Sequence, residues 1–280
     1  MVITEQRWNA VRDALPQAGA RFADLVLTAH DPATRVTADW SVVETTAHVG
    51  FIALMYRVMV RGGDEPLPLP ALTTSIKQAR TDTVADMNTL ALREYPERDP
   101  VRLSEKLRTD IAEILRRSEG IDPERPVSWL GGALVPVAGV LAHLLNELLI
   151  HGLDIARAIG VPWPIRAVDE ALFFDLFLVG MTRNSVGTLL DDAVPSPRRI
   201  AVEFRSAHTD PVVMALQHGH VTIEEPDGAS DVRLSFDPAV LVPMMFGRVS
   251  RARAVLTRKV VIGGPRPWLL RPFLKVVRMP

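Results

Sequence analysis

The stretch that decides the fold is LAHLLNELLIHGLDIARAIG, residues 141–160. It is an apolar helical run that also carries a carboxylate and two imidazoles. Side chains four residues apart share one face of an α-helix, so His143, Glu147 and His151 form one stripe. Asp154 continues the stripe three residues further on. An apolar core needs no such side chains, and we therefore treat the stripe as the first candidate site.

The helical spacing limits how many of these side chains one metal ion can bind. Glu147 and His151 lie about 6 Å apart along the helix axis, whereas His143 and His151 lie about 12 Å apart. One ion can take one adjacent pair, and a third ligand must come from elsewhere. Glu and neutral His are ordinary ligands for zinc and similar divalent ions. The alternative interpretation is structural, with both histidines hydrogen-bonded in a core or interface and Glu147 at a solvated edge.

The composition indicates a globular protein with no thiol of its own. The chain has 280 residues, 48% of them apolar, which is enough for one large domain or two modest ones. It has no cysteine, which excludes disulfides, cysteine metal ligands and a cysteine nucleophile. The N-terminal MVITEQRWNAVRDALPQ lacks the apolar core of a signal peptide, and we find no uninterrupted apolar stretch long enough to span a membrane. We therefore predict a cytoplasmic protein.

The charge is unevenly distributed along the chain. The net charge is −1, but nine basic residues and no acidic one follow Asp237. The basic end, PRPWLLRPFLKVVRMP, allows contact with an anionic membrane surface or ligand. A last amphipathic helix with a solvated basic face is the interpretation we favour. Aromatic residues are too sparse to favour nucleic acid as a partner.

The N-terminal part predicts four long helices. Apolar residues recur three and four apart over residues 5–27, as on one buried helical face. Ser41 with Glu44 forms a capping box that opens a second helix, which runs to about Arg61 and carries His48 near its middle. His48 is the natural candidate for a third ligand.

The remaining two helices complete a bundle. Asp99 followed by Pro100 starts a third helix that continues to Gly120, after a long excursion with helical character over residues 74–93. The fourth helix contains the opening stretch and ends at Gly160. Four helices over residues 5–160 suffice for a bundle whose core can hold a metal between facing helices.

The pattern changes after residue 165. Residues 166–190 predict one more helix, and short alternating segments follow, typical of an antiparallel sheet. These segments are RRIAVEFR, DPVVMALQ, HVTIEE and DVRLSF, followed by a short helix in FDPAVLVPMMFGR, a strand in KVVIGG and a closing helix in PRPWLLRPFLKVV. We therefore predict a four-helix bundle over 1–164, a connecting helix over 165–192 and an α+β domain over 193–280.

Two segments, DWSVVETTAHVG and NELLIHGLDIARAIG, resemble the mycothiol-dependent maleylpyruvate isomerase family. In that family a tryptophan and a capping hydroxyl precede a helix with a histidine, and a later helix carries Glu-x-x-x-His-Gly-x-Asp. The matching residues are Trp40, Ser41, His48, Glu147, His151, Gly152 and Asp154. The resemblance implies a DinB-like four-helix bundle with a catalytic divalent metal, commonly zinc, and a smaller C-terminal domain like sterol carrier protein 2 (SCP2-like).

The resemblance also implies roles for the residues of the stripe. His48, Glu147 and His151 would bind the metal, which leaves His143 outside the ligand set. Asp154 would orient an imidazole, although an ordinary solvent-facing residue is the alternative for it. Because the chain has no cysteine, the thiol would be mycothiol, acting as a cosubstrate.

The implied chemistry is that of a thiolate activated by the metal. It would add to a conjugated double bond of a small electrophilic substrate, and its elimination after rotation would restore the alkene in trans form. The same thiolate would also suit an S-transferase, and the sequence does not choose between the two. The alternative function is a non-catalytic protein that carries an apolar ligand in the SCP2-like domain, with a structural metal in the bundle. That alternative starts from an apolar cluster containing Met244, Met245, Phe246 and Trp268, which also suits plain core.

Overall fold

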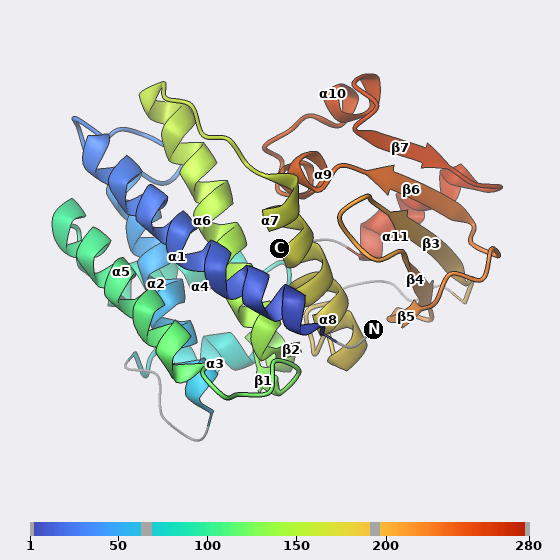
Figure 1. The fold of residues 1–280 in the computed structure, drawn as a ribbon, viewed down its shortest axis with the longest axis horizontal. Coiled ribbons are helices and arrows are strands. Elements are labelled where there is room, and N and C mark those ends of the chain that lie inside the picture. The colour runs from blue at the N-terminus through green and yellow to red at the C-terminus, as the bar shows by residue number, and fades with distance from the viewer. Residues whose placement is uncertain (1–2, 63–68, 191–196, 278–280) are drawn as a thin grey trace.

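A computed structural model describes residues 3–62, 69–190 and 197–277 of the chain. Long helices form one half of the molecule, and a sheet with short helices forms the other half (Figure 1). A further helical stretch lies between the two halves. The predicted fold class, a helical bundle followed by an α+β unit, is confirmed.

The bundle consists of four long helices. They are α1 (Glu5–Thr28), α2 (Val42–Arg61), α5 (Pro100–Arg117) and α6 (Val137–Ile159). Both α1 and α2 pack against α5 and against α6, so that α6 has neighbours on two sides within the bundle. It also packs against the helical stretch that separates the two halves. This position explains why α6 is apolar over most of its surface and why most of its polar residues are buried.

The helix ends follow local signals in the sequence. Ser41 and Glu44 form the predicted capping box at the start of α2, with each side chain bonded to the backbone of the other. Asp99 caps α5 through the backbone N–H of Arg102. At the end of α6, Gly160 adopts a φ of +75°, a left-handed conformation that favours glycine. These predictions of where helices begin and end are confirmed.

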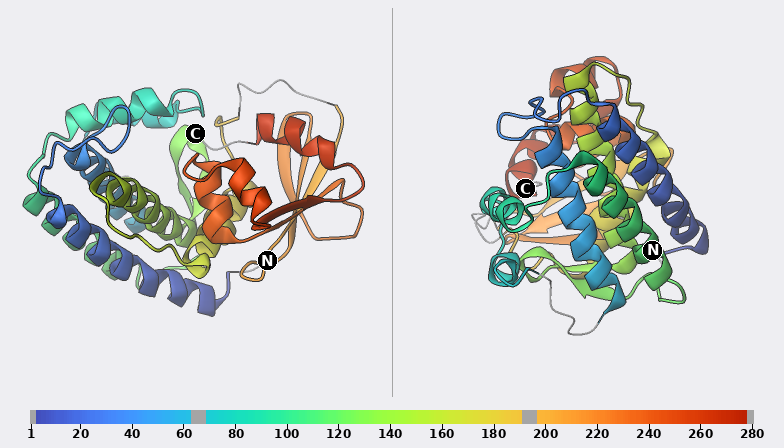
Figure 2. Two further views of the ribbon diagram at one scale, coloured as in Figure 1. Left: turned by 90° about the horizontal axis from the view of Figure 1, so that it is seen from above. Right: turned by 90° about the vertical axis from the view of Figure 1, so that its left-hand side faces the viewer.

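The excursion between α2 and α5 contains two short helices. They are α3 (Leu72–Lys77) and α4 (Val84–Glu94), which lie along one side of the bundle (Figure 2). Residues 63–68, where the excursion begins, lie outside the described residues. Between α5 and α6 the chain forms a small hairpin that the sequence did not predict, made by β1 (Pro126–Ser128) and β2 (Leu134–Pro136) around the 3-10 turn η1 (Leu130–Gly132).

One continuous helical stretch separates the bundle from the sheet. It comprises α7 (Ala167–Leu172), the π-helical η2 (Phe173–Val179) and α8 (Gly180–Asn184). The predicted helix over 166–190 is therefore too long at its C-terminal end. Ser185 is extended and its backbone oxygen accepts a bond from Leu134 of β2, which ends the helix. The buried phenylalanines of η2 face both halves of the molecule.

The C-terminal half is a five-stranded sheet with short helices. The strands are β3 (Ile200–Arg205), β4 (Val212–Gln217), β5 (His220–Glu224), β6 (Val232–Phe236) and β7 (Val260–Gly263). The helices are α9 (Pro238–Met245), α10 (Arg251–Leu256), η3 (Pro267–Leu269) and α11 (Leu270–Val276). Of these helices, α10 was not predicted.

The sheet is mixed rather than antiparallel. Its strand order is β5-β4-β3-β6-β7, and β3 pairs with β6 in parallel while the other pairs are antiparallel. After the edge strand β5 the chain crosses, through residues 225–231, to the far side of β3. The prediction of an antiparallel sheet is therefore wrong for the pair of β3 and β6. The alternation of side chains shows which residues of a strand share a face, but it does not show which strand lies next to it or in which direction that strand runs.

One helix, α6, is long and apolar enough to cross a membrane by length and composition. However, 89% of its most apolar window is buried inside the molecule. Such burial is typical of the core helix of a soluble protein. The cytoplasmic location stays a prediction.

Candidate metal centre

Three side chains from α2 and α6 converge in the bundle. His48 of α2 places its Nε2 3.4 Å from Oε2 of Glu147, and His151 places its Nε2 3.3 Å from the same oxygen. The three residues offer ligand atoms that all lie within 4.8 Å of one another. Within the described parts of the chain, this is the one group of at least three His, Cys, Asp or Glu side chains with such a spacing.

Within the described residues, the oxygen at the centre of this group has no hydrogen-bond partner. Oε2 of Glu147 is buried, and its contacts with the two imidazoles have ion-pair distances without hydrogen-bond geometry. Burying a polar atom without a hydrogen-bond partner costs free energy, and such atoms are rare in proteins. The unpaired oxygen of Glu147 therefore needs an explanation. One carboxylate oxygen and two imidazole nitrogens form a donor set that fits a divalent cation.

The charges of the group depend strongly on their neighbours. Burial favours the neutral form of Glu147, but the adjacent His151 and His48 outweigh it and hold the pKa of Glu147 well below its ordinary value. Burial also opposes charge on His151, but Asp154 and Glu147 raise the pKa of His151 to about 9. The pKa of His48 is lowered, chiefly by burial. Without a cation, the carboxylate is therefore ionised and His151 carries the compensating charge.

Asp154 lies behind His151 and connects it to the C-terminal half. Its Oδ2 is 3.3 Å from Nδ1 of His151, a distance without hydrogen-bond geometry. Arg248, just after α9, holds the same carboxylate with two nitrogens, at 2.7 Å from Nη2 to Oδ2 and 3.1 Å from Nε to Oδ1. Burial raises the pKa of Asp154, but His151 and Arg248 outweigh it, so the pKa is lowered. Asp154 is buried, and not the solvent-facing residue of the alternative interpretation.

Two further aromatic groups border the centre. The ring of Trp40, just before α2, lies 4.7 Å from the ring of His48 and 6.0 Å from that of His151. On the other side, His143 places Nε2 3.6 Å from Oε1 of Glu147, the oxygen that faces away from the other two histidines. The structure thus brings His143 next to the group without making it part of the close trio.

A cavity of about 790 Å³ lies in the C-terminal half, outside the metal centre. Residues of all five strands form one wall, and η2, α8, α9, α10, η3 and α11 contribute most of the rest. Its lining is largely apolar, and the charged residues in it are all basic. Trp129 and Phe177 line the cavity and also pack on the ring of His143, at 5.2 and 4.5 Å between ring centroids. These two side chains form a wall that the cavity shares with the surroundings of the metal centre.

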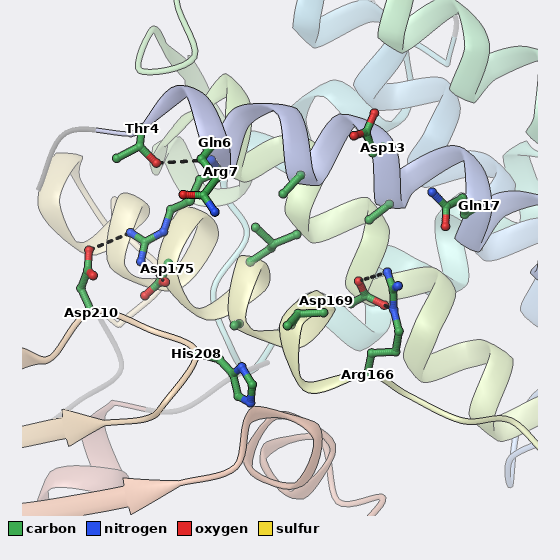
Figure 3. Close-up of a pocket in the computed structure, with 15 residues that line it drawn as sticks. Thr4, Gln6, Arg7, Asp13, Gln17, Arg166, Asp169, Asp175, His208 and Asp210 are labelled. Atoms are coloured by element: carbon green, nitrogen blue, oxygen red, sulfur yellow. Dashed lines mark hydrogen bonds and ion pairs between the residues drawn. The ribbon is translucent and has the colours of Figure 1, made fainter.

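A second hollow, of about 620 Å³, lies between α1, α7, η2 and the loop after β3 (Figure 3). Arg7 of α1 reaches Asp210 of that loop at 2.9 Å, and the close-up shows the link directly. Arg7 also lies 2.9 Å from Asp175 of η2, yet burial raises the pKa of Asp175 to about 7. The polar side chains of this hollow are largely paired with one another, which identifies it as a contact between the two halves.

Sequence reasoning named the close trio but not all of its neighbours. Arg248 is 94 positions from Asp154, and no local pattern connects them. Tyr56 and Trp129, which contact His143, were likewise not assigned a role. The signal in the sequence that could have indicated Tyr56 and Trp129 is a histidine on a buried helical face, because a buried histidine needs hydrogen-bond partners.

One family model and two solved structures resemble the chain. A family model described as "Mycothiol maleylpyruvate isomerase N-terminal domain" matches residues 11–156, which include the close trio. A solved mutant of the mycothiol-dependent maleylpyruvate isomerase shares the fold, with a TM-score of 0.53 and 11% identity over 91% of this chain and 92% of that chain. A second structure of that isomerase gives a TM-score of 0.47 with the same identity and coverage. No curated protein matches the sequence. Because the model covers more than half of its residues, the chain belongs to the mycothiol maleylpyruvate isomerase N-terminal domain family.

Proposed function

We propose that the chain is a metal-dependent enzyme that uses mycothiol to isomerise a small electrophilic substrate. In this proposal His48, Glu147 and His151 hold a divalent cation. The observation that carries it is the buried Oε2 of Glu147, which lacks a hydrogen bond while two imidazole nitrogens lie 3.3 and 3.4 Å away. A cation among these atoms would satisfy the oxygen and leave both imidazoles neutral.

The proposed cation is zinc, and iron, nickel and manganese also suit two imidazoles and one carboxylate. With three protein ligands and one open position, such an ion acts as a Lewis acid that lets a thiol lose its proton near neutral pH. Glu147 supplies a negative charge that offsets part of the ion's charge. Asp154, held by Arg248, keeps the ring of His151 in place through its Nδ1 side. Trp40 packs on the ring of His48.

The thiol must come from a cosubstrate because the chain has no cysteine. Membership of the family supports mycothiol for this role. The proposed reaction is a cis–trans isomerisation in which the thiol adds to a conjugated double bond, the carbon–carbon bond rotates, and departure of the thiol restores the alkene. Transfer of the thiol to the electrophile is the alternative outcome at the same site, and it differs by leaving a stable thioether.

Metal analysis tests the proposed ligands. Protein purified without chelator or affinity-tag histidines should contain about one divalent ion per chain by plasma mass spectrometry. Glu147→Gln should lose this ion. Glu170→Gln is a matched control, because Glu170 is also a buried glutamate but has no contact with the close trio. Wild-type protein that contains no metal and does not bind added zinc would contradict the proposal.

A product assay tests the reaction. Incubation with maleylpyruvate and mycothiol should convert the cis substrate to the trans isomer without net consumption of thiol. A thioether product would instead indicate an S-transferase. The conversion should be absent without mycothiol and absent in His48→Ala. Equal turnover with and without the thiol would contradict the role of mycothiol.

A second candidate function rests on the cavity in the C-terminal half. Its volume of about 790 Å³ lies in the range of small-molecule sites. Arg251, Arg271 and Lys275 line it. Among the described residues, no acidic side chain lines the cavity and these three have no ion pair. The cavity therefore suits an apolar ligand with an anionic end, such as a long-chain carboxylate, in a protein that binds rather than catalyses.

Ligand titration of the full chain tests this second candidate. Each methylene added to a fatty acid should tighten binding about four-fold, equivalent to about 0.8 kcal/mol per buried methylene. Arg251→Gln should weaken binding of the carboxylate, whereas Arg253→Gln, on the same helix but outside the lining, should not. If neither fatty acids nor the corresponding alcohols bind, the cavity is not a ligand site.

A further inference from the structure

His143 lies one helical turn before Glu147 on α6 and is not one of the three proposed ligands. Its Nδ1 is 2.9 Å from the hydroxyl oxygen of Tyr56, on the facing helix α2. The indole N–H of Trp129 donates to the same hydroxyl oxygen at 2.8 Å. All three side chains are buried, with exposed fractions of 7%, 0% and 4% for His143, Tyr56 and Trp129. These contacts form a chain of hydrogen bonds that ends at His143, beside the metal centre.

The direction of each bond in this chain follows from the groups involved. An indole nitrogen only donates, so the Tyr56 oxygen accepts from Trp129. The hydroxyl proton of Tyr56 then needs an acceptor in a site without access to solvent, and Nδ1 of His143 is the atom within reach. A neutral imidazole carries one proton, and Nδ1 cannot carry it while it accepts from the hydroxyl of Tyr56. The proton of His143 is therefore on Nε2.

The Nε2 of His143 faces Glu147. It lies 3.6 Å from Oε1, whereas Oε2 of the same carboxylate lies 3.4 and 3.3 Å from the Nε2 atoms of His48 and His151. A deprotonated Nε2 at this place would oppose the negative carboxylate, so the second end of the ring also favours the Nε2–H tautomer. The contact at Nδ1 and the contact at Nε2 thus each indicate the Nε2–H tautomer of His143.

We infer that His143 is a positioning residue of the metal centre. Tyr56 and Trp129 fix its ring as the Nε2–H tautomer, and this N–H holds Oε1 of Glu147 so that Oε2 faces His48 and His151. Aromatic packing keeps the ring in place, with Phe177 at 4.5 Å and Trp129 at 5.2 Å between centroids. The inference rests on the proposed function only in naming the metal that Oε2 would bind.

The tautomer can be measured in the metal-free full chain. Long-range ¹H–¹⁵N correlation spectra of protein labelled at histidine should show a neutral Nε2–H ring for His143, assigned by the loss of its signals in His143→Gln. Tyr56→Phe removes the hydroxyl proton that Nδ1 accepts, so the Nδ1 resonance should move toward that of an unprotonated nitrogen without a hydrogen bond, while Nε2 keeps its proton. A wild-type ring protonated at Nδ1 would overturn the inference.

Zinc affinity tests the consequence for the metal centre. By competition with a chromophoric chelator, Tyr56→Phe and His143→Leu should each weaken zinc binding by about 10- to 100-fold, the usual effect of losing a group that orients a ligand. His143→Gln should retain most of the affinity, because its amide N–H can take the place of Nε2–H. Wild-type affinity in His143→Leu would overturn the inference.

The other tyrosine of the chain provides a matched control. Tyr95 is buried as well, and its hydroxyl has no hydrogen-bond partner in the described structure. Tyr95→Phe should therefore leave zinc affinity and the His143 spectrum unchanged. A loss of affinity equal to that of Tyr56→Phe would show that the effect is general destabilisation, and would count against the inference. If wild-type protein bound no zinc, the proposed function would fail, and the tautomer alone would decide the inference.

Discussion

The metal centre and the apolar cavity are both interior regions, but they differ in the ionisable side chains that they contain. Around Glu147 the bundle brings ionisable side chains together from two helices. Among the described residues, the lining of the cavity contains no acidic side chain, and its basic ones lie at exposed positions. Burial alone therefore does not say what a region does. The informative feature is whether the buried polar atoms have partners.

The two regions also differ in how their charge is compensated. In the metal centre the carboxylate is kept ionised by histidines, although burial by itself favours the neutral acid. In the cavity no anion within the described residues balances Arg251, Arg271 or Lys275. A cation would satisfy the first arrangement and an anion the second. Trp129 and Phe177 line the cavity and also pack on His143, so a change in this wall tests the comparison most directly.

Removing one side of the wall should have the largest effect. Phe177 is fully buried and packs on Phe173, Trp129 and His143. Phe177→Ala should lower the free energy of unfolding by about 3–5 kcal/mol, because it leaves a cavity that its neighbours fill only in part. Urea denaturation measures the loss, and Phe177→Leu should lose less. A loss below about 1 kcal/mol would show that the wall is not continuous packing.

The pH dependence of stability should change by a smaller amount through Asp175. This residue lies on η2, and burial raises its pKa to about 7, from 3.8 in the unfolded chain. Between these values the folded protein keeps a proton that the unfolded chain has released, so this group's contribution to stability is lost as pH rises. Relative to Asp175→Asn, wild-type protein should lose about 2 kcal/mol between pH 5 and pH 7.

Denaturation curves at both pH values measure this effect. The control is Asp210→Asn, because Asp210 contacts the same Arg7 from an exposed position. Parallel pH profiles for wild type and Asp175→Asn would contradict the prediction. Asp175 adds a third case to the comparison. It is a buried carboxyl group that is kept neutral at a contact between the two halves, whereas the buried carboxylate of Glu147 is ionised.

Local signals in the sequence were sufficient for most of the elements. The capping box of Ser41 and Glu44 and the left-handed Gly160 depend on neighbouring residues, and the structure has both. The four-residue spacing on α6 placed His143, Glu147 and His151 along one side of one helix for the same reason. The helical period determines which side chains share one face of the helix, and this is enough to predict the stripe of polar residues.

Contacts between distant segments were beyond such signals. The parallel pairing of β3 with β6, the link from Arg248 to Asp154 and the hydroxyl of Tyr56 beside His143 each join segments that no local pattern connects. The predicted helix over 166–190 was too long because its end depends on Ser185 pairing with the β2 strand. The periodicity of one segment does not contain information about its partner. The metal role of the trio, which came from the family resemblance and fits the geometry, stays a prediction until metal is measured.

The smallest predicted effect concerns the link between the two halves through Arg248. Arg248→Gln removes the bidentate contact to Asp154, so the carboxylate behind His151 loses its fixed orientation. Zinc affinity should fall by about ten-fold, at the lower end of what loss of an orienting group costs, because Asp154 itself remains. A chelator competition titration measures it, with Arg253→Gln as the control from the same half of the molecule.

A double-mutant cycle shows whether this link acts through Asp154. If it does, Arg248→Gln should have little further effect on zinc affinity in an Asp154→Asn background, because both changes disrupt the same contact to His151. Additive losses would mean that Arg248 affects the centre by another route. Unchanged affinity in Arg248→Gln would mean that the C-terminal half does not contribute to the metal centre, and that the two regions are coupled only through the aromatic wall.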